Sequence, residues 1–136
     1  MVQESPPTVP VDDVPELDAV AARLDELLGN HSEREVALVA RLVGGFPVKA
    51  SGLVERWSTA TLTGEHEEAA RAIHTLKGTA LNLGSRTLPR ACEEIESWSR
   101  AGGPDGEAEH RERLESAVAV LARGLAEAAS ARAIVD

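Results

Sequence analysis

Aromatic residues and cysteines are scarce in this 136-residue sequence, and both shortages exclude classes of protein. Aromatics make up 2% of the chain, whereas Ala, Leu, Val, Glu and Arg are abundant, which favours helix over strand. A single cysteine, Cys92, excludes an internal disulfide framework and a cysteine-based zinc site. Cys92 falls on the apolar side of its expected helix, so we interpret it as a small buried hydrophobic residue.

Positive charge and long apolar runs are also in short supply. The chain carries 14 basic and 23 acidic residues, a net charge of −9. Sequence-independent binding of nucleic acid needs clustered positive charge, so no nucleic-acid partner is expected. An acidic surface repels anionic lipid, and no apolar run approaches the ~20 residues of a membrane span. The first residues lack the basic and apolar parts of a signal peptide. We therefore expect a cytoplasmic protein without a membrane partner.

The start of the chain differs in composition from the rest. Residues 1–14 hold three of the seven prolines and show no periodicity, which predicts a disordered N-terminal segment. Residues 15–132 are expected to form one helical domain. The starting Met and the proline-rich lead favour a free-standing protein. A first helix is predicted to begin in Asp13-Val-Pro-Glu16, with Asp13 as its N-cap, and to end at about Leu28.

The second helix is expected to be unusually long. Ser32 and Glu35 form a capping box at its start. Apolar residues then recur every seven positions from Val36 to Trp57, and this register does not change phase at Pro47. Two separate helices would have no reason to keep phase, so we predict one helix kinked at Pro47, with a break there as the alternative.

Three further helices complete the predicted fold. The first spans about residues 65–83. The second follows it, with Ser85 as its N-cap and Pro89 in its first turn. The third spans about residues 107–131. Gly84 fits a helix C-cap, and residues 102–106 read as a loop. The sequence contains neither a strand pattern nor a repeat. We therefore expect an all-α protein, an antiparallel up-down four-helix bundle with a short N-terminal capping helix.

The segment around His74 carries the most unusual surface. The apolar residues of this helix recur every three or four positions and form one buried stripe: Ala69, Ile73, Leu76, Ala80 and Leu83. His74 lies on the opposite face, with Lys77 and Gly78 beside it. Glycine inside a helix costs ~1 kcal/mol relative to alanine. Close approach by another molecule is the simplest reason to have it there.

Helix geometry predicts a neighbour for this histidine. Gly84 lies about 15 Å along the helix from His74, and an antiparallel return reaches the same height near residue 95 or 96. Glu96 is therefore level with His74, provided that the outer faces of the two helices adjoin. A carboxylate that accepts from Nδ1–H would fix the tautomer and leave Nε2 free as a nucleophile. The alternative is a solvated glutamate.

The run His74-Thr-Leu-Lys77-Gly78, with Gly84 ten residues after the histidine, resembles the signature of histidine phosphotransfer (HPt) domains. The resemblance covers roughly residues 30–130. It continues at the spacing of that family through a second set of positions: Leu88, Cys92, Ile95 and Glu96. It implies that His74 accepts a phosphoryl group from the aspartyl phosphate of a receiver domain and passes it to another, with Glu96 as partner of the histidine.

Basic residues near His74 fit this chemistry. Only two of the 14 basic residues are lysines, Lys49 and Lys77. A compact ammonium at Lys77 is expected to stabilise the charge of the phosphoryl group, with a solvated surface lysine as the alternative. Four residues are predicted to form the receiver-docking face: Arg71, Gly78, Leu81 and Arg100. Arg100 is also placed to pair with Glu96 at i,i+4.

Rival chemistries lack their motifs. A di-iron bundle needs two Glu-x-x-His pairs, and Glu107-Ala-Glu-His110 is the only one. His31, His66 and His110 fall at helix starts or loops and are interpreted as solvent-exposed. There is no Gly-x4-Gly-Lys-Ser/Thr loop for ATP. We expect no cofactor or metal on this chain, and Mg²⁺ on the partner receiver.

These observations favour a monomeric phosphoryl carrier that is not an enzyme by itself. The resemblance implies that its partners are receiver domains of response regulators or hybrid histidine kinases. Two alternatives stay open. One is a non-catalytic helical adaptor whose histidine is incidental, and the other is the N-terminal phosphoacceptor module of a chemotaxis-type kinase.

Overall fold

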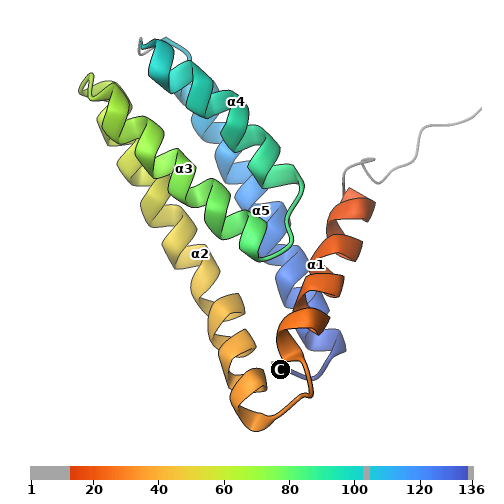
Figure 1. The fold of residues 1–136 in the computed structure, drawn as a ribbon. Coiled ribbons are helices and arrows are strands. Elements are labelled where there is room, and N and C mark those ends of the chain that lie inside the picture. Colours follow the sequence, from red (N-terminus) through yellow and green to blue (C-terminus); the bar gives the residue numbers. More distant parts are fainter. Residues whose placement is uncertain (1–12, 103–104, 135–136) are drawn as a thin grey trace, which may run out of the picture.

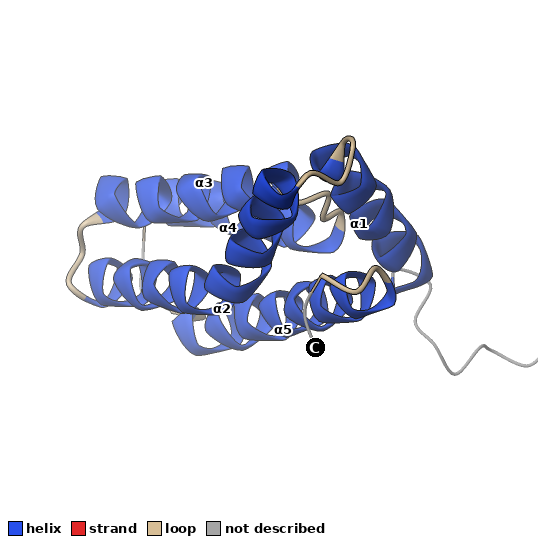
Figure 2. Cartoon of the chain, turned by 90° about the horizontal axis from the view of Figure 1, so that it is seen from below, coloured by secondary structure: helices blue, strands red, loops and turns tan. Residues whose placement is uncertain are grey.

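The computed structural model describes residues 13–102 and 105–134, and these form five α-helices without a strand (Figures 1 and 2). The helices are α1 (Asp13–Leu28), α2 (Glu33–Leu62), α3 (His66–Asn82), α4 (Thr87–Ala101) and α5 (Glu107–Ala131). The all-α expectation is confirmed. Of the predicted disordered segment, residues 1–14, the first twelve lie outside the described residues. Asp13 and Val14 already belong to α1.

The five helices surround one core. α3 packs between α2 and α4, and α5 contacts α2 and α4 on the other side (Figure 1). α1 lies against α5 and, over a smaller area, against α2. Fully buried side chains come from every helix, among them Leu24, Phe46, Trp57, Ile73, Ile95 and Leu121. The indole N–H of Trp57 donates to the hydroxyl of Ser99 at 2.9 Å, which satisfies the one polar group of this large core residue.

α2 is one continuous helix of 30 residues with Pro47 inside it, as the unbroken heptad register predicted. The capping box at its start is also confirmed. The Glu35 N–H donates to Ser32 Oγ at 3.1 Å, and Glu35 Oε1 accepts from the Ser32 N–H at 3.1 Å. The apolar register holds the helix together across the proline because Phe46 and Trp57, on either side of it, are both buried in the same core.

By length and composition alone, α2 could also cross a membrane. It is the one helix in the described part of the chain that passes this test, and the apolar stretch has a mean hydropathy of 1.4. The sequence analysis had found no such run. In the fold, α2 lies between α3 and α5 and supplies the core with Phe46 and Trp57. Helix packing therefore accounts for the buried residues of α2, which make up 28% of this apolar stretch.

The turn between α3 and α4 is fixed by Gly84. The Gly84 N–H donates to the Leu81 carbonyl and the Ser85 N–H to the Ala80 carbonyl, both at 3.0 Å, the hydrogen-bond pattern of a Schellman motif. Gly84 has φ +86°, and a Cβ there would lie 2.8 Å from the Ala19 carbonyl oxygen of α1. Glycine is thus required both for the turn and for the close approach of α1.

The predicted N-cap of α4 was one residue too early. Arg86, not Ser85, is the residue that precedes the helix, and its side chain caps nothing. The Ser85 hydroxyl still accepts from the Leu88 N–H at 3.3 Å. The first N–H groups of α4 instead reach a carboxyl group from α1, which the local sequence pattern could not reveal.

That carboxyl group belongs to Glu16, which is fully buried. Its Oε1 accepts from the N–H groups of Arg86 at 2.6 Å and Thr87 at 2.9 Å, and its Oε2 accepts from the Ser85 hydroxyl at 2.7 Å. A negative group at a helix N-terminus is stabilised by the unpaired N–H groups and the helix dipole. Glu16 therefore joins α1 to the turn that sets α4 against α3.

Candidate functional site

His74 projects from the outer face of α3. Its side chain is 68% exposed, whereas its neighbours Ile73 and Leu76 are fully buried. The apolar stripe that holds α3 in the bundle therefore turns the imidazole away from the core. A small molecule or a protein can approach it without any rearrangement of the fold.

Glu96 on α4 lies beside this imidazole. Its Oε2 is 3.5 Å from His74 Nδ1, and its side chain is only 17% exposed. The position along α4 that was estimated from helix rise thus correctly identified Glu96 as the neighbour of His74. Arg100 Nη2 donates to the same oxygen at 3.0 Å, and Arg100 Nη1 lies 3.3 Å from Glu67. The predicted i,i+4 pair of Glu96 and Arg100 is present.

The charge of Glu96 is stabilised by these neighbours. Burial alone would raise the pKa of the Glu96 carboxyl group, but the hydrogen bonds from Arg100 and His74 outweigh burial and hold that pKa below its usual range. Glu96 is therefore a carboxylate at neutral pH. Its position beside Nδ1 favours the tautomer with the proton on Nδ1, which leaves the lone pair on Nε2.

Two cations predicted near the histidine are paired elsewhere. Lys77 Nζ lies 3.3 Å from Glu93 Oε2 on α4, and Arg71 Nη1 lies 3.2 Å from Glu68 on α3. The sequence had placed the Lys77 ammonium near Nε2 of His74, and its contribution to phosphoryl transfer stays a prediction. Lys77 is one turn from His74, and Glu93 holds its ammonium on the α4 side of α3.

Open space surrounds the next turn of α3. A Cβ built on Gly78 would meet no heavy atom of another element within 4 Å, and Leu81 is 54% exposed. Gly78 does not have a positive φ, so its backbone alone does not require glycine. Because Gly78 has no side chain, nothing projects from this position of α3 beside the His74 imidazole.

The other histidines and the cysteine lie apart from this site. In the described ranges, no three His, Cys, Asp or Glu side chains are grouped closely enough to hold a metal ion. His31 and His66 are exposed, as expected. His110 was expected to be exposed but is half-buried, with its ring 4.5 Å from that of Trp98. Cys92 is buried in α4, and burial raises the pKa of its thiol to about 12.

The sequence analysis missed the acidic partners of these cations. Glu68 lies three residues before Arg71 on α3, so helical spacing alone could have identified this pair. The contact of Glu67 with Arg100 crosses from α3 to α4. Glu93 lies one turn before Glu96 on α4, and its contact with Lys77 crosses between two helices. That contact depends on how the helices pack, which no local pattern specifies.

The part of the chain that carries this site matches a known protein family. A family model described as the Hpt domain matches residues 41–124, well over half of the chain, and includes both His74 and Glu96. Comparisons with curated proteins and with solved structures found no significant match. Hpt domains are phosphoryl carriers of two-component signalling, and this chain belongs to the Hpt domain family.

Proposed function

We propose that His74 accepts a phosphoryl group from the aspartyl phosphate of a receiver domain and passes it to another receiver. The observation that supports this best is the exposed imidazole with Glu96 at Nδ1. The Nε2 lone pair would attack phosphorus as the bond to the aspartate oxygen breaks, which returns the aspartate as a carboxylate. The Nδ1 proton stays in place, and Glu96 offsets the positive charge that the ring gains.

The carrier role leaves the remaining chemistry to the partner. In-line transfer needs an exposed nucleophile and an unobstructed approach, which His74 and the open turn at Gly78 supply. Mg²⁺ and the acidic pocket that binds it are assigned to the receiver. We further propose that the chain acts as a cytoplasmic monomer, with α2 to α5 as an up-down bundle and α1 as its capping helix.

Two incubations test this function against its alternatives. In one, the chain is mixed with phosphorylated receiver domains; in the other, with ATP and the catalytic domain of a chemotaxis-type kinase. Rapid transfer from a receiver to His74 is the expected result. Labelling by the kinase domain alone would favour the kinase-module alternative, and no labelling by either would favour an adaptor.

Removal of Glu96 should change the chemistry of the imidazole rather than the fold. In Glu96→Gln, loss of the charged acceptor at Nδ1 should shift the tautomer balance towards Nε2–H and slow phosphoryl gain about tenfold, equal to ~1.4 kcal/mol. The measurement is the pair of ¹⁵N shifts of the His74 ring together with the transfer rate. Unchanged ring shifts would remove Glu96 from the site.

Lys77 offers a separate test, because one substitution removes its charge and another removes the glutamate that pairs with it. Lys77→Ala should slow phosphoryl gain or shorten the lifetime of the adduct, since a nearby positive charge is lost. Glu93→Gln removes the partner seen at 3.3 Å and frees the ammonium, so it should have the opposite effect. Equal transfer rates in the two variants and the wild type would show that Lys77 is only a surface residue.

Substitution of Gly78 should separate stability from transfer. Gly78→Ala is expected to stabilise the fold by up to ~1 kcal/mol, because alanine is the better helix former and its Cβ meets no neighbour. Gly78→Gln should also fold but obstruct the partner, with Gly78→Ala intermediate in transfer rate. Thermal melting and transfer from a receiver are measured for all three chains. Unimpaired transfer by Gly78→Gln would mean that the partner does not approach over this turn.

A further inference from the structure

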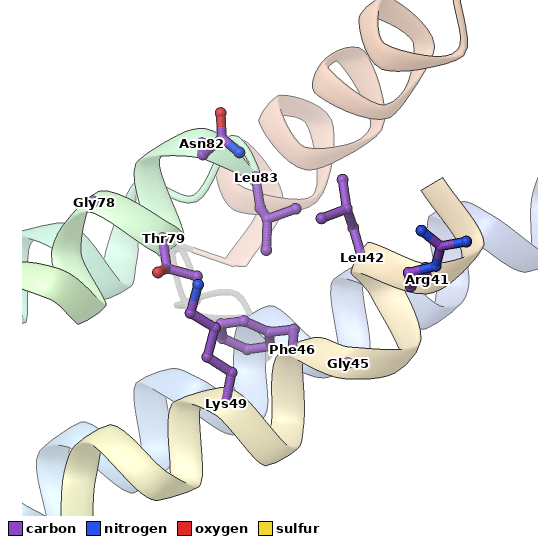
Figure 3. Close-up of a pocket in the computed structure, with 9 residues that line it drawn as sticks. All are labelled: Arg41, Leu42, Gly45, Phe46, Lys49, Gly78, Thr79, Asn82 and Leu83. Carbon is purple, nitrogen blue, oxygen red and sulfur yellow. The ribbon is translucent and has the colours of Figure 1, made fainter. Parts of the chain in front are cut away.

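A cavity of about 600 Å³ opens between α2 and α3, next to the turn that carries Gly78 (Figure 3). Three apolar side chains line it: Leu42, Phe46 and Leu83. In Figure 3, Leu42 and Leu83 point towards one another, and Lys49 extends from α2 towards Thr79 on α3. Gly45 and Gly78 line the cavity without side chains that would fill it. We call this cavity the α2–α3 pocket.

Two cations border the pocket, and neither has a charged or hydrogen-bonded partner among the residues that the structure describes. The side chains of Arg41 and Lys49 make no ion pair or hydrogen bond within the described part of the chain. Lys77, Arg71 and Arg100 near His74 are each paired with a glutamate. In a chain with a net charge of −9, unmatched cations beside an apolar hollow are complementary to an acidic, partly apolar ligand.

The pocket is continuous with the proposed site. Gly78 lies one turn after His74 on α3 and also lines the pocket. A protein that covers Gly78 to reach the imidazole therefore covers the mouth of the pocket as well. The two lysines of the chain stand on opposite sides of this turn, because Lys77 contacts Glu93 on α4 and Lys49 belongs to α2.

We propose that the α2–α3 pocket receives an apolar side chain of the receiver domain, and that Arg41 and Lys49 select receivers with acidic residues on either side of it. This inference rests on the proposed function. Arg41 and Lys49 are eight residues apart, about 12 Å along α2. The partner segment that fits is therefore amphipathic, with an apolar residue between two acidic ones. Rim charges of this kind act mainly on association and on its salt dependence.

Two glycines of α2 provide a matched test of the pocket. A Cβ on Gly44 or on Gly45 would meet no heavy atom of another element within 4 Å, but only Gly45 lines the pocket. Gly45→Trp should fill the pocket and Gly44→Trp should not. Both should stay folded, which thermal melting checks. The charge of the rim is tested with the double variant Arg41→Glu/Lys49→Glu. Its control is Arg123→Glu, at an exposed arginine of α5 that does not line the pocket.

The probe is the set of receiver domains of the same organism, each phosphorylated with acetyl phosphate. Gly45→Trp and the double charge variant should lower the second-order rate constant of transfer at least tenfold, and the charge effect should shrink at high salt. Gly44→Trp and Arg123→Glu should stay within twofold of the wild type. Equal rates for Gly45→Trp and Gly44→Trp, or for the two charge variants, would overturn the proposal.

Phosphoramidate phosphorylates histidine without any docked protein. Labelling with it therefore tests the reactivity of His74 separately from the binding of a receiver at the pocket. All variants should be labelled on His74 by phosphoramidate at the wild-type rate. Normal labelling with transfer unaffected by the pocket variants would overturn the pocket alone. If His74 is labelled neither by phosphoramidate nor by any receiver, both the carrier function and the pocket proposal fail.

Discussion

Replacement of His74 by glutamine is expected to abolish phosphorylation of this chain completely. The imidazole is the nucleophile of the proposed transfer, and glutamine keeps a polar side chain of similar reach without a ring nitrogen. Because the His74 side chain is 68% exposed and makes no core contact, the melting temperature should change by no more than about 2 °C. Labelling from a phosphorylated receiver, with tests for acid lability and base stability of the adduct, is the measurement.

His66→Gln is the matched control, since His66 is an exposed histidine at the start of the same helix. It should be labelled at the wild-type rate. Acceptance of phosphate by His74→Gln at the wild-type rate would show that the phosphoacceptor is another residue.

Glu16→Ala is expected to cause the largest loss of stability, about 3 kcal/mol, which lowers the melting temperature by about 10 °C. The substitution removes the acceptor of the N–H groups of Arg86 and Thr87 and of the hydroxyl of the buried Ser85. Thermal and denaturant unfolding, followed by circular dichroism, measure the effect.

Asp18→Ala controls for the loss of one acidic residue from α1. Asp18 is exposed on the same helix, so its substitution should change stability by about 0.5 kcal/mol or less. If Glu16→Ala melts within about 2 °C of this control, the buried carboxyl group does not hold α1 to the α3–α4 turn.

Patterns within one helix were enough to predict the all-α class and most of the helices. The seven-residue repeat of apolar residues correctly predicted that α2 continues through Pro47. The repeat holds along the whole helix because the same side of α2 faces the core throughout. The capping box of Ser32 and Glu35 was predictable for a similar reason, since both of its hydrogen bonds form within four residues. The adjacency of His74 and Glu96 followed from helix rise once the two helices were taken as antiparallel with adjoining outer faces.

Contacts between distant segments were not predictable in this way. Glu16 was treated as part of a helix start, where an exposed acid is common, and its partners lie about 70 residues away. Burial of His110 against Trp98 depends on the crossing of α4 and α5. The α2–α3 pocket has no local signal either, because Phe46 and Leu83 read as ordinary core residues until the two helices are packed.

The buried thiol of Cys92 has a consequence for redox chemistry. The thiolate is the form of cysteine that reacts with peroxides and disulfides, and a thiol pKa of about 12 leaves almost none of it at neutral pH. Cys92 lies one turn before Glu96 on α4, so an oxidised sulfur there would disturb the helix that positions the partner of His74. Burial thus protects this part of α4 from oxidants, and we expect Glu96 to keep its place beside His74 under oxidising conditions.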